Sequence, residues 1–162
     1  MTIDPLATGD LGRLRGWLQL SDVQGWWGSA ARAEAEVAMA LASPSAICRI
    51  VHTDGEAVGY AHALDGALMA GAGRPELPGS WDCALFIASP AHRGRGIGAS
   101  ALELLVAEVF ATTLAVGCTI RVPVAKESAV RVVEAAGFSW SHVEEDAALG
   151  RVWVLACERP RR

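Results

Sequence analysis

The chain has 162 residues, of which 52% are hydrophobic and 20% are charged. These values exclude intrinsic disorder, a collagen-like repeat and a disulfide scaffold, because a chain of this size and composition can bury a full core. The formal net charge of −4 argues against a nucleic-acid partner and favours a cationic small molecule. We expect one domain over residues 1–162, since no linker or internal repeat divides the chain.

The cysteines and the first residues indicate a reducing compartment. The four cysteines are scattered through apolar stretches without a Cys-x-x-Cys pair, which predicts buried thiols. The N-terminal residues lack a basic region and an apolar segment, and no stretch reaches the roughly 20 apolar residues of a membrane span. No histidine has a partner at metal-ligand spacing. We therefore expect a cytoplasmic protein with no membrane contact and no metal.

The front of the chain is expected to hold one strand and two helices. Residues 2–6 are typical of a short strand. After a cap at residues 8–10, apolar side chains recur at the spacing of an amphipathic helix, at Leu11, Leu14, Trp17 and Leu18. A second helix, rich in alanine and glutamate, is expected over residues 29–41 and ends before Pro44.

A β-hairpin is predicted next. Strands over residues 46–52 and 57–64 flank an Asp54-Gly55 pair, which is a strong short-range hairpin signal. Residues 65–80 follow as a loop containing glycine and proline. This loop is longer than a simple connection, which is typical of a lid on the substrate side.

The second half of the chain alternates between strands and helices. A strand, a helix, a strand, a helix and a final two-stranded hairpin are expected over residues 81–88, 96–112, 118–122, 128–136, and 138–144 with 151–157. This order predicts an α/β (α+β) domain with a mixed sheet.

The glycine-rich turn Arg93-Gly94-Arg95-Gly96-Ile97-Gly98 is the most informative segment. Glycines let the backbone turn sharply and aim several N–H groups at one anion, and the following helix N-terminus adds partial positive charge. Together these features predict a pyrophosphate cradle. The turn lacks the Gly-Lys-Ser/Thr of a P-loop and the spacing of a dinucleotide-binding fingerprint. A flexible turn or a basic contact loop is the alternative.

The segment from Phe86 to Gly98 resembles motif A of the GNAT superfamily of acyl-CoA-dependent N-acetyltransferases. The resemblance implies the GNAT fold, a central mixed and mostly antiparallel sheet flanked by helices and splayed between strands 4 and 5. It also implies acetyl-CoA as co-substrate. Carried over by position, the pantetheine arm would contact Phe86, Ile87 and Ala88, and the pyrophosphate would be wrapped by Arg93, Gly94, Arg95, Gly96, Ile97, Gly98 and Ala99.

The front end resembles the aminoglycoside 6′-N-acetyltransferase group through residues 10–18 and the following Asp22-to-Gly28 segment. The resemblance places Trp26 and Trp27 between the first two helices, beside the acceptor cleft, where they would bind substrate. Siderophore-pathway acetyltransferases share this front end, so the acceptor stays undecided. Core packing is the alternative for at least one of the two rings.

Acetyl transfer to an amine requires a group that accepts a proton. An alkyl amine with a pKa near 10.4 is neutral only ~0.04% of the time at pH 7, and only the neutral form attacks a thioester. In relatives this base is often an aspartate on the fourth strand, at the position of Ala84 here. Asp82, two residues upstream on the same face, is one candidate base and acceptor-binding residue. Another candidate base is His62, which shares a strand face with Tyr60. Because the third strand neighbours the fourth in the GNAT fold, the resemblance implies that Tyr60, His62 and Asp82 converge, and all three are candidate catalytic residues.

A second departure concerns the helix before Gly137. By position, the family's asparagine is Lys126 here, and its tyrosine, which commonly protonates the leaving thiolate, is Val133. Lys126 is therefore a candidate for the phosphates of the coenzyme. A thiolate leaves without an acid because the pKa of a thiol is only near 8.5.

The sequence predicts an acetyl-CoA-dependent N-acetyltransferase that acts on a primary amine, with an aminoglycoside 6′-amine as the first candidate. The alternatives are a polyamine, a protein N-terminus, a siderophore precursor, or a catalytically weak acyl-CoA-binding protein. We expect a small-molecule partner and no nucleic acid. Edge strands of such sheets often pair, so a homodimer stays open.

Overall fold

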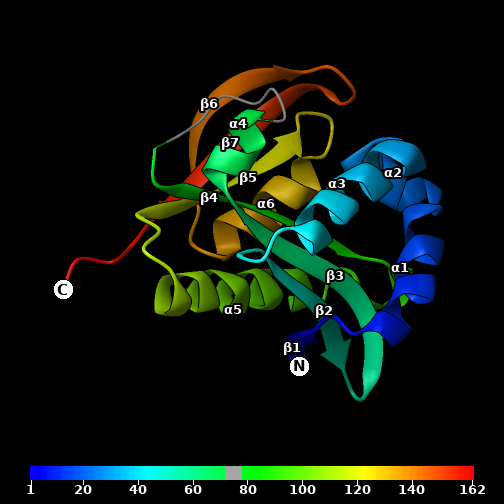
Figure 1. The fold of residues 1–162 in the computed structure, drawn as a ribbon. Helices are drawn as coiled ribbons and strands as arrows, with labels where there is room; N and C mark the ends of the chain where they lie inside the picture. The colour runs from blue at the N-terminus through cyan, green and yellow to red at the C-terminus, as the bar shows by residue number, and fades with distance from the viewer. Residues whose placement is uncertain (72–77) are drawn as a thin grey trace.

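The computed structural model describes residues 1–71 and 78–162, which form a sheet with helices on both faces (Figure 1). Within these ranges the sheet has seven strands in the order β1-β2-β3-β4-β5-β7-β6. The strands are β1 (Thr2–Pro5), β2 (Ile47–Thr53), β3 (Glu56–Asp65), β4 (Ser80–Ile87), β5 (Gly117–Pro123), β6 (Ser139–Asp146) and β7 (Gly150–Glu158). The helices are α1 (Leu11–Leu18), α2 (Ser21–Trp27), α3 (Ala30–Ala42), α4 (Gly66–Gly71), α5 (Ile97–Thr112) and α6 (Glu127–Ala135).

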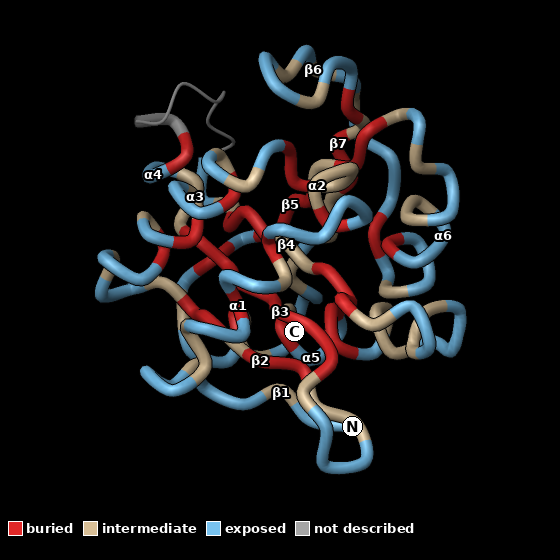
Figure 2. The backbone as a smooth tube through the Cα atoms, turned by 90° about the vertical axis from the view of Figure 1, so that its right-hand side faces the viewer, coloured by how far each residue is buried: buried red, intermediate tan, exposed pale blue. Residues whose placement is uncertain are grey.

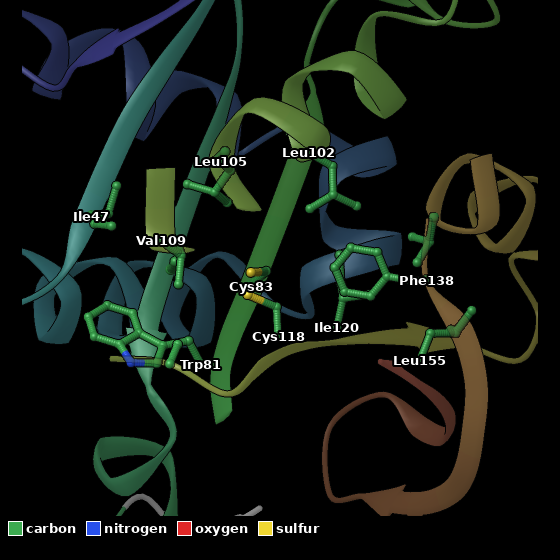
Figure 3. Packing of buried hydrophobic residues seen from close by; sticks show 14 of the residues in the cluster. Ile47, Trp81, Cys83, Leu102, Leu105, Val109, Cys118, Ile120, Phe138 and Leu155 are labelled. Atoms are coloured by element: carbon green, nitrogen blue, oxygen red, sulfur yellow. The ribbon is translucent and has the colours of Figure 1, made fainter. Parts of the chain in front are cut away.

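The central strands are buried on both faces because their side chains alternate between two helical layers. On β3, Tyr60 and Leu64 belong to the core under α1, α2 and α3, whereas Ala61 and Ala63 belong to the core under α5. Figure 3 shows the α5 side, where leucines of α5 lie over Cys83 and Trp81 of β4. Figure 2 shows the buried backbone concentrated at this centre, while the β6 end is exposed.

The sheet opens between β4 and β5. Neighbouring strands run antiparallel except β4 and β5, which pair in parallel over Ser80–Cys83 and Gly117–Ile120 only. β4 continues along β3 as far as Ile87. Ala88 donates its N–H to the Val58 carbonyl on the β3 side. Because backbone polar groups alternate in direction along a strand, those of Leu85 and Ile87 point into the gap that β5 leaves.

The mixed, mostly antiparallel sheet and its splay between the fourth and fifth strands are confirmed. Two predictions at the level of elements are wrong. Residues 21–27 form α2, and residues 66–71, expected as loop, form α4. The remainder of the expected lid, residues 72–77, lies outside the described residues. No helix in the two described ranges is long and apolar enough to cross a bilayer.

Candidate active site

One cavity of about 340 Å³ runs from the gap between β4 and β5 to the space under α2 and α3. Its first part is walled by residues 83–87 of β4, residues 120–123 of β5 and the apolar face of α6. The glycine-rich turn and the first residues of α5 close one end. At the other end stand Trp26 and Trp27, the charged side chains of α3, and the β6–β7 hairpin. The splay of the sheet therefore joins the two ends of one site.

The glycine-rich turn presents backbone N–H groups to this cavity. Gly94 and Gly96 have φ values of 71° and 77°, a left-handed conformation that other residues rarely adopt. Gly96 directly precedes α5, and the helical ladder begins with the bond from Ser100 N–H to the Gly96 carbonyl. The N–H groups of Ile97, Gly98 and Ala99 therefore precede the ladder at a helix N-terminus. This geometry suits a pyrophosphate.

The two arginines of the turn lie differently from each other. Arg93 donates to the carbonyls of Ile87 and Ala88, pairs with Asp22 of α2 at 2.7 Å, and stacks over the Trp26 ring at 4.9 Å. Its side chain thus ties the end of β4 to α2, and its contribution to a cradle would come from the backbone. Arg95, in the middle of the turn, is exposed to solvent.

The open edge of β4 carries two side-chain donors. Trp27 Nε1 lies 3.4 Å from the Leu85 carbonyl oxygen, and Arg93 Nε lies 3.0 Å from that of Ile87. Both carbonyls point into the gap, and so do the N–H groups of the same two residues. The edge therefore presents N–H donors to a ligand that lies along β4, which suits an extended arm with amide carbonyls and a thioester.

Trp26 and Trp27 both line the cavity from the end of α2, which lies between the two helices predicted for the front of the chain. Trp27 is buried and meets Tyr60, His62 and Phe86 edge-on, with ring centroids 5.3–5.9 Å apart. Trp26 is half-buried under the Arg93 guanidinium. Trp27 therefore serves the core and the cavity wall together.

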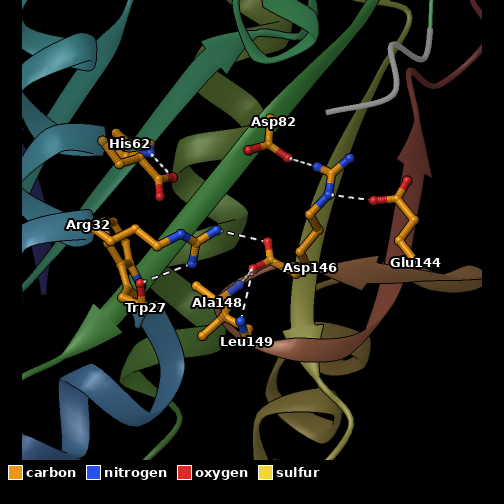
Figure 4. A network of polar contacts seen from close by, with 10 residues as sticks. Trp27, Arg32, His62, Asp82, Glu144, Asp146, Ala148 and Leu149 are labelled. Atoms are coloured by element: carbon orange, nitrogen blue, oxygen red, sulfur yellow. Dashed lines mark hydrogen bonds and ion pairs between the residues drawn. The ribbon is translucent and has the colours of Figure 1, made fainter. Parts of the chain in front are cut away.

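Charged side chains from α3, β4, β5 and the β6–β7 hairpin meet at the far end of the cavity (Figure 4). Arg32 donates to the Trp27 carbonyl and binds Asp146 at 2.8 Å. Asp146 also accepts the N–H groups of Ala148 and Leu149, which fixes the hairpin tip. This set of contacts anchors the hairpin to α3.

Asp82 belongs to a second network at this end. Its carboxylate binds Arg121 of β5 and accepts from Thr119, and Arg121 also binds Glu144 of β6. Burial opposes the charge on Arg121, but Asp82 and Glu144 raise the pKa of its guanidinium. Asp82 therefore faces the cavity as one member of an ion-pair network.

Tyr60 and His62 form a separate buried pair. The Tyr60 hydroxyl lies 2.9 Å from His62 Nδ1, and His62 Nε2 lies 3.4 Å from Glu36 Oε1 of α3. Burial, followed by the Cys48 thiol, raises the pKa of Tyr60, so its hydroxyl keeps its proton. Tyr60 and His62 lie on the same face of the sheet as Asp82 of β4. Within the described residues, however, His62 contacts Glu36, whereas Asp82 contacts Arg121.

Val133 of α6 and Lys126, which precedes the helix, are the two positions here that depart from the family pattern. Val133 is buried and lines the cavity, so the wall at this point is apolar. Lys126 caps α6, and its ammonium lies over Gly25 of α2, where an added Cβ would meet Nζ at 3.0 Å. Lys126 stays a predicted contact of the coenzyme. Within the described residues no group of three histidine, cysteine or acidic side chains is placed to hold a metal ion.

A family model of the acetyltransferase (GNAT) domain matches residues 7–144. The chain belongs to the GNAT family. It is thus an acetyl-CoA-dependent acetyltransferase, and the sheet splayed beside a glycine-rich turn is the expected place for the coenzyme. A search of curated proteins finds no match.

Solved structures share the fold of this GNAT domain. Aminoglycoside acetyltransferase AAC(6')-Ib in complex with coenzyme A and kanamycin is 24% identical with a TM-score of 0.82, covering 98% of this chain and 94% of that chain. Spermidine N-acetyltransferase from Vibrio cholerae, in complex with CoA and spermine, is 16% identical with a TM-score of 0.73, covering 97% and 94%. Aminoglycoside N(6')acetyltransferase from Legionella pneumophila is 15% identical with a TM-score of 0.73, covering 96% and 90%.

Sequence reasoning missed four charged residues that line the cavity: Arg32, Glu36, Arg121 and Asp146. Arg121 carried a signal, because it is a charge inside an otherwise apolar strand. Arg32 and Glu36 are four residues apart and so share a helix face. Asp146 carried none, because only the fold brings the hairpin to α3.

Proposed function

We propose that this GNAT enzyme transfers acetyl from acetyl-CoA to the primary amine of a small cationic acceptor, with an aminoglycoside 6′-amine as the first candidate. One observation carries the proposal: a single cavity joins the glycine-rich turn before α5 to an acceptor chamber. We define this chamber as the end of the cavity that is lined by Trp26, Trp27, Glu36, Asp82 and Asp146. The carboxylates attract an ammonium group, and the aromatic walls suit its carbon frame.

The residues at the first end fit acetyl-CoA. The N–H groups of residues 97–99 would hold the pyrophosphate, and residues 86–88 would border the pantetheine arm. The Leu85 N–H, which points into the gap, would polarise the thioester carbonyl as charge develops on its oxygen. The amine attacks that carbon, the C–N bond forms, and the C–S bond breaks with its electron pair passing to sulfur. The thiolate leaves without an acid at Val133, since its conjugate thiol has an ordinary pKa near 8.5.

The acceptor would lie between Trp26, Trp27 and Asp82. Polyamines are the second candidate, because the chamber brings carboxylates from α3, β4 and the β6–β7 hairpin to one place. Two structures of the same fold contain kanamycin and spermine, which supports testing both aminoglycosides and polyamines as acceptors. A carboxylate bound by a guanidinium accepts a proton less readily, which favours positioning over proton transfer for Asp82.

The test is thiol release from acetyl-CoA across aminoglycosides with and without a 6′-amine, polyamines and short peptides. Binding of acetyl-CoA is measured separately by calorimetry. Turnover restricted to acceptors with a 6′-amine supports the aminoglycoside proposal, and turnover of spermidine alone replaces it with the polyamine. Binding of acetyl-CoA without turnover on any amine would overturn the proposed transfer and favour a catalytically weak acyl-CoA-binding protein.

A further inference from the structure

We propose that Glu36 is the base that takes the proton from the acceptor amine, and that His62 is the positioning residue that holds it. The inference rests on the proposed transfer to an amine. It assigns the proton transfer to a residue of α3 that touches the chamber, where the sequence pointed to Asp82 or to His62 itself.

Glu36 lies beside His62 at the cavity wall. It lines the cavity, and its Oε1 is 3.4 Å from His62 Nε2. His62 is paired with Ala84 across β3 and β4, so their Cβ atoms lie about 5 Å apart on one face. Ala84 directly precedes Leu85, whose N–H points into the gap. Ala84 and Glu36 line the same cavity, so the residue next to His62 on this face is small.

A buried chain of polar groups fixes the orientation of His62. The imidazole is fully buried, and Trp27 packs edge-on against it at 5.3 Å. The Tyr60 hydroxyl, which keeps its proton, lies 2.9 Å from Nδ1, and the Cys48 thiol is within hydrogen-bonding reach of that hydroxyl. We assign Nδ1 as the acceptor of this pair, which puts a ring N–H on Nε2, the nitrogen that faces Glu36.

His62 Nε2 makes no hydrogen bond within the described part of the chain, and the Glu36 carboxylate is its charged neighbour at 3.4 Å. A small rotation of Glu36 completes an N–H···O bond that fixes the orientation of the carboxylate at the cavity wall. Among the described residues, the other charged groups that line this end of the cavity include Arg32 on the same helix, Asp82, Arg121 and Asp146. Arg32 binds Asp146, and Arg121 binds Asp82.

The acceptor enters as an ammonium and gives one proton to the Glu36 carboxylate. The neutral nitrogen then attacks the thioester carbon, and the C–S bond breaks. The second proton leaves the new amide nitrogen for the thiolate, which departs as thiol. Glu36 returns its proton to water, so each turnover releases one amide, one thiol and one proton.

The experiment compares Glu36→Gln with Glu34→Gln, an exposed glutamate on the same helix. The readout is kcat/KM from pH 6 to pH 9 with the best acceptor of the panel. We expect a flat profile for the wild type and Glu34→Gln. Glu36→Gln should lose about 100-fold or more at pH 7. Its kcat/KM should rise about tenfold per pH unit, because it uses only amine that is already neutral.

His62 is tested by His62→Leu and by His62→Gln, which restores a donor. We expect His62→Leu to lower kcat about tenfold and to leave the KM for the acceptor unchanged. His62→Gln should recover most of the lost kcat. A flat profile with wild-type kcat/KM in Glu36→Gln overturns the inference while the proposed function stands. If kcat/KM rises about tenfold per pH unit in Asp82→Asn but does not change with pH in Glu36→Gln, the base is Asp82 and the inference is wrong. A wild type that acetylates no amine overturns both.

Discussion

The indole nitrogen of Trp27 lies 3.4 Å from the carbonyl oxygen of Leu85, on the edge of β4 that β5 leaves unpaired. A buried ring of α2 thus covers one polar group of an edge that would otherwise meet only ligand or solvent. The same ring packs edge-on against Phe86 and His62. Trp27 therefore links the wall of the coenzyme groove to the acceptor chamber.

Trp27→Phe removes the N–H donor and keeps an aromatic ring against Phe86. We expect the free energy of unfolding to fall by about 1–2 kcal/mol, from the lost hydrogen bond and the smaller ring. Urea denaturation gives the value. Trp26→Phe is the control, because Trp26 is half-buried and makes its described ring contact with Arg93. Equal losses in the two variants would mean that the bond to Leu85 contributes nothing.

Gly96→Val tests the cradle. Gly96 has a φ of 77°, so valine costs about 1–2 kcal/mol there and turns the N–H groups at the start of α5 away from one another. We expect calorimetry to detect no binding of acetyl-CoA although the domain folds. Gly55→Val is a matched control, with a φ of 76° in the β2–β3 turn and open space around it. It should show the same strain and bind acetyl-CoA normally; unchanged affinity in Gly96→Val would remove the cradle from residues 94–99.

The sequence was sufficient where local rules decide the structure. Asp54 and Gly55 both adopt positive φ, as the predicted hairpin turn requires, and the apolar periodicity located each strand to within one or two residues. α2 escaped prediction because Gly25 interrupts it and only Val23 and Trp27 are buried along it. A short helix with two glycines nearby has little pattern of its own, so its packing on α3 decides its conformation.

The chamber was predicted only in part because its contacts are long-range. Arg32 and Asp146 are 114 residues apart, and Asp82 and Arg121 are 39 apart. Asp82 could be selected as an acid near the reacting groups, but its guanidinium partner depends on how β4 and β5 diverge. Local propensity contains no information on which of several arginines reaches a given carboxylate.

Asp82→Asn tests whether Asp82 acts through structure. Asp82 and Arg121 are both largely buried, so Asp82→Asn removes the ion pair between them and leaves Glu144 as the charged partner of Arg121. We expect the free energy of unfolding to fall by about 2 kcal/mol, measured by urea denaturation. A double-mutant cycle with Arg121→Gln should show strong coupling, whereas additive losses would contradict the network. The pH profile of kcat/KM should keep its wild-type shape.

Glu144→Gln tests the outer end of the same network through pH. Burial alone would raise the pKa of Glu144, but hydrogen bonds from His142 and Arg121 outweigh it and lower that pKa below its ordinary value of 4.5. A lowered native pKa adds stability above pH 4.5, and this stability is lost as the pH falls through the native value. Glu144→Gln should therefore be less stable than wild type by about 1–2 kcal/mol at pH 7. The gap should close on acidification below pH 4.5.

The control for this titration is Glu145→Gln. Glu145 is the adjacent residue, but it pairs with Arg151 at the surface, where both side chains are exposed to solvent and the pair contributes little. Thermal unfolding of all three proteins between pH 3 and pH 7 separates the cases. A gap between wild type and Glu144→Gln that stays constant with pH would assign the loss to packing, because only a proton-linked contribution disappears on acidification.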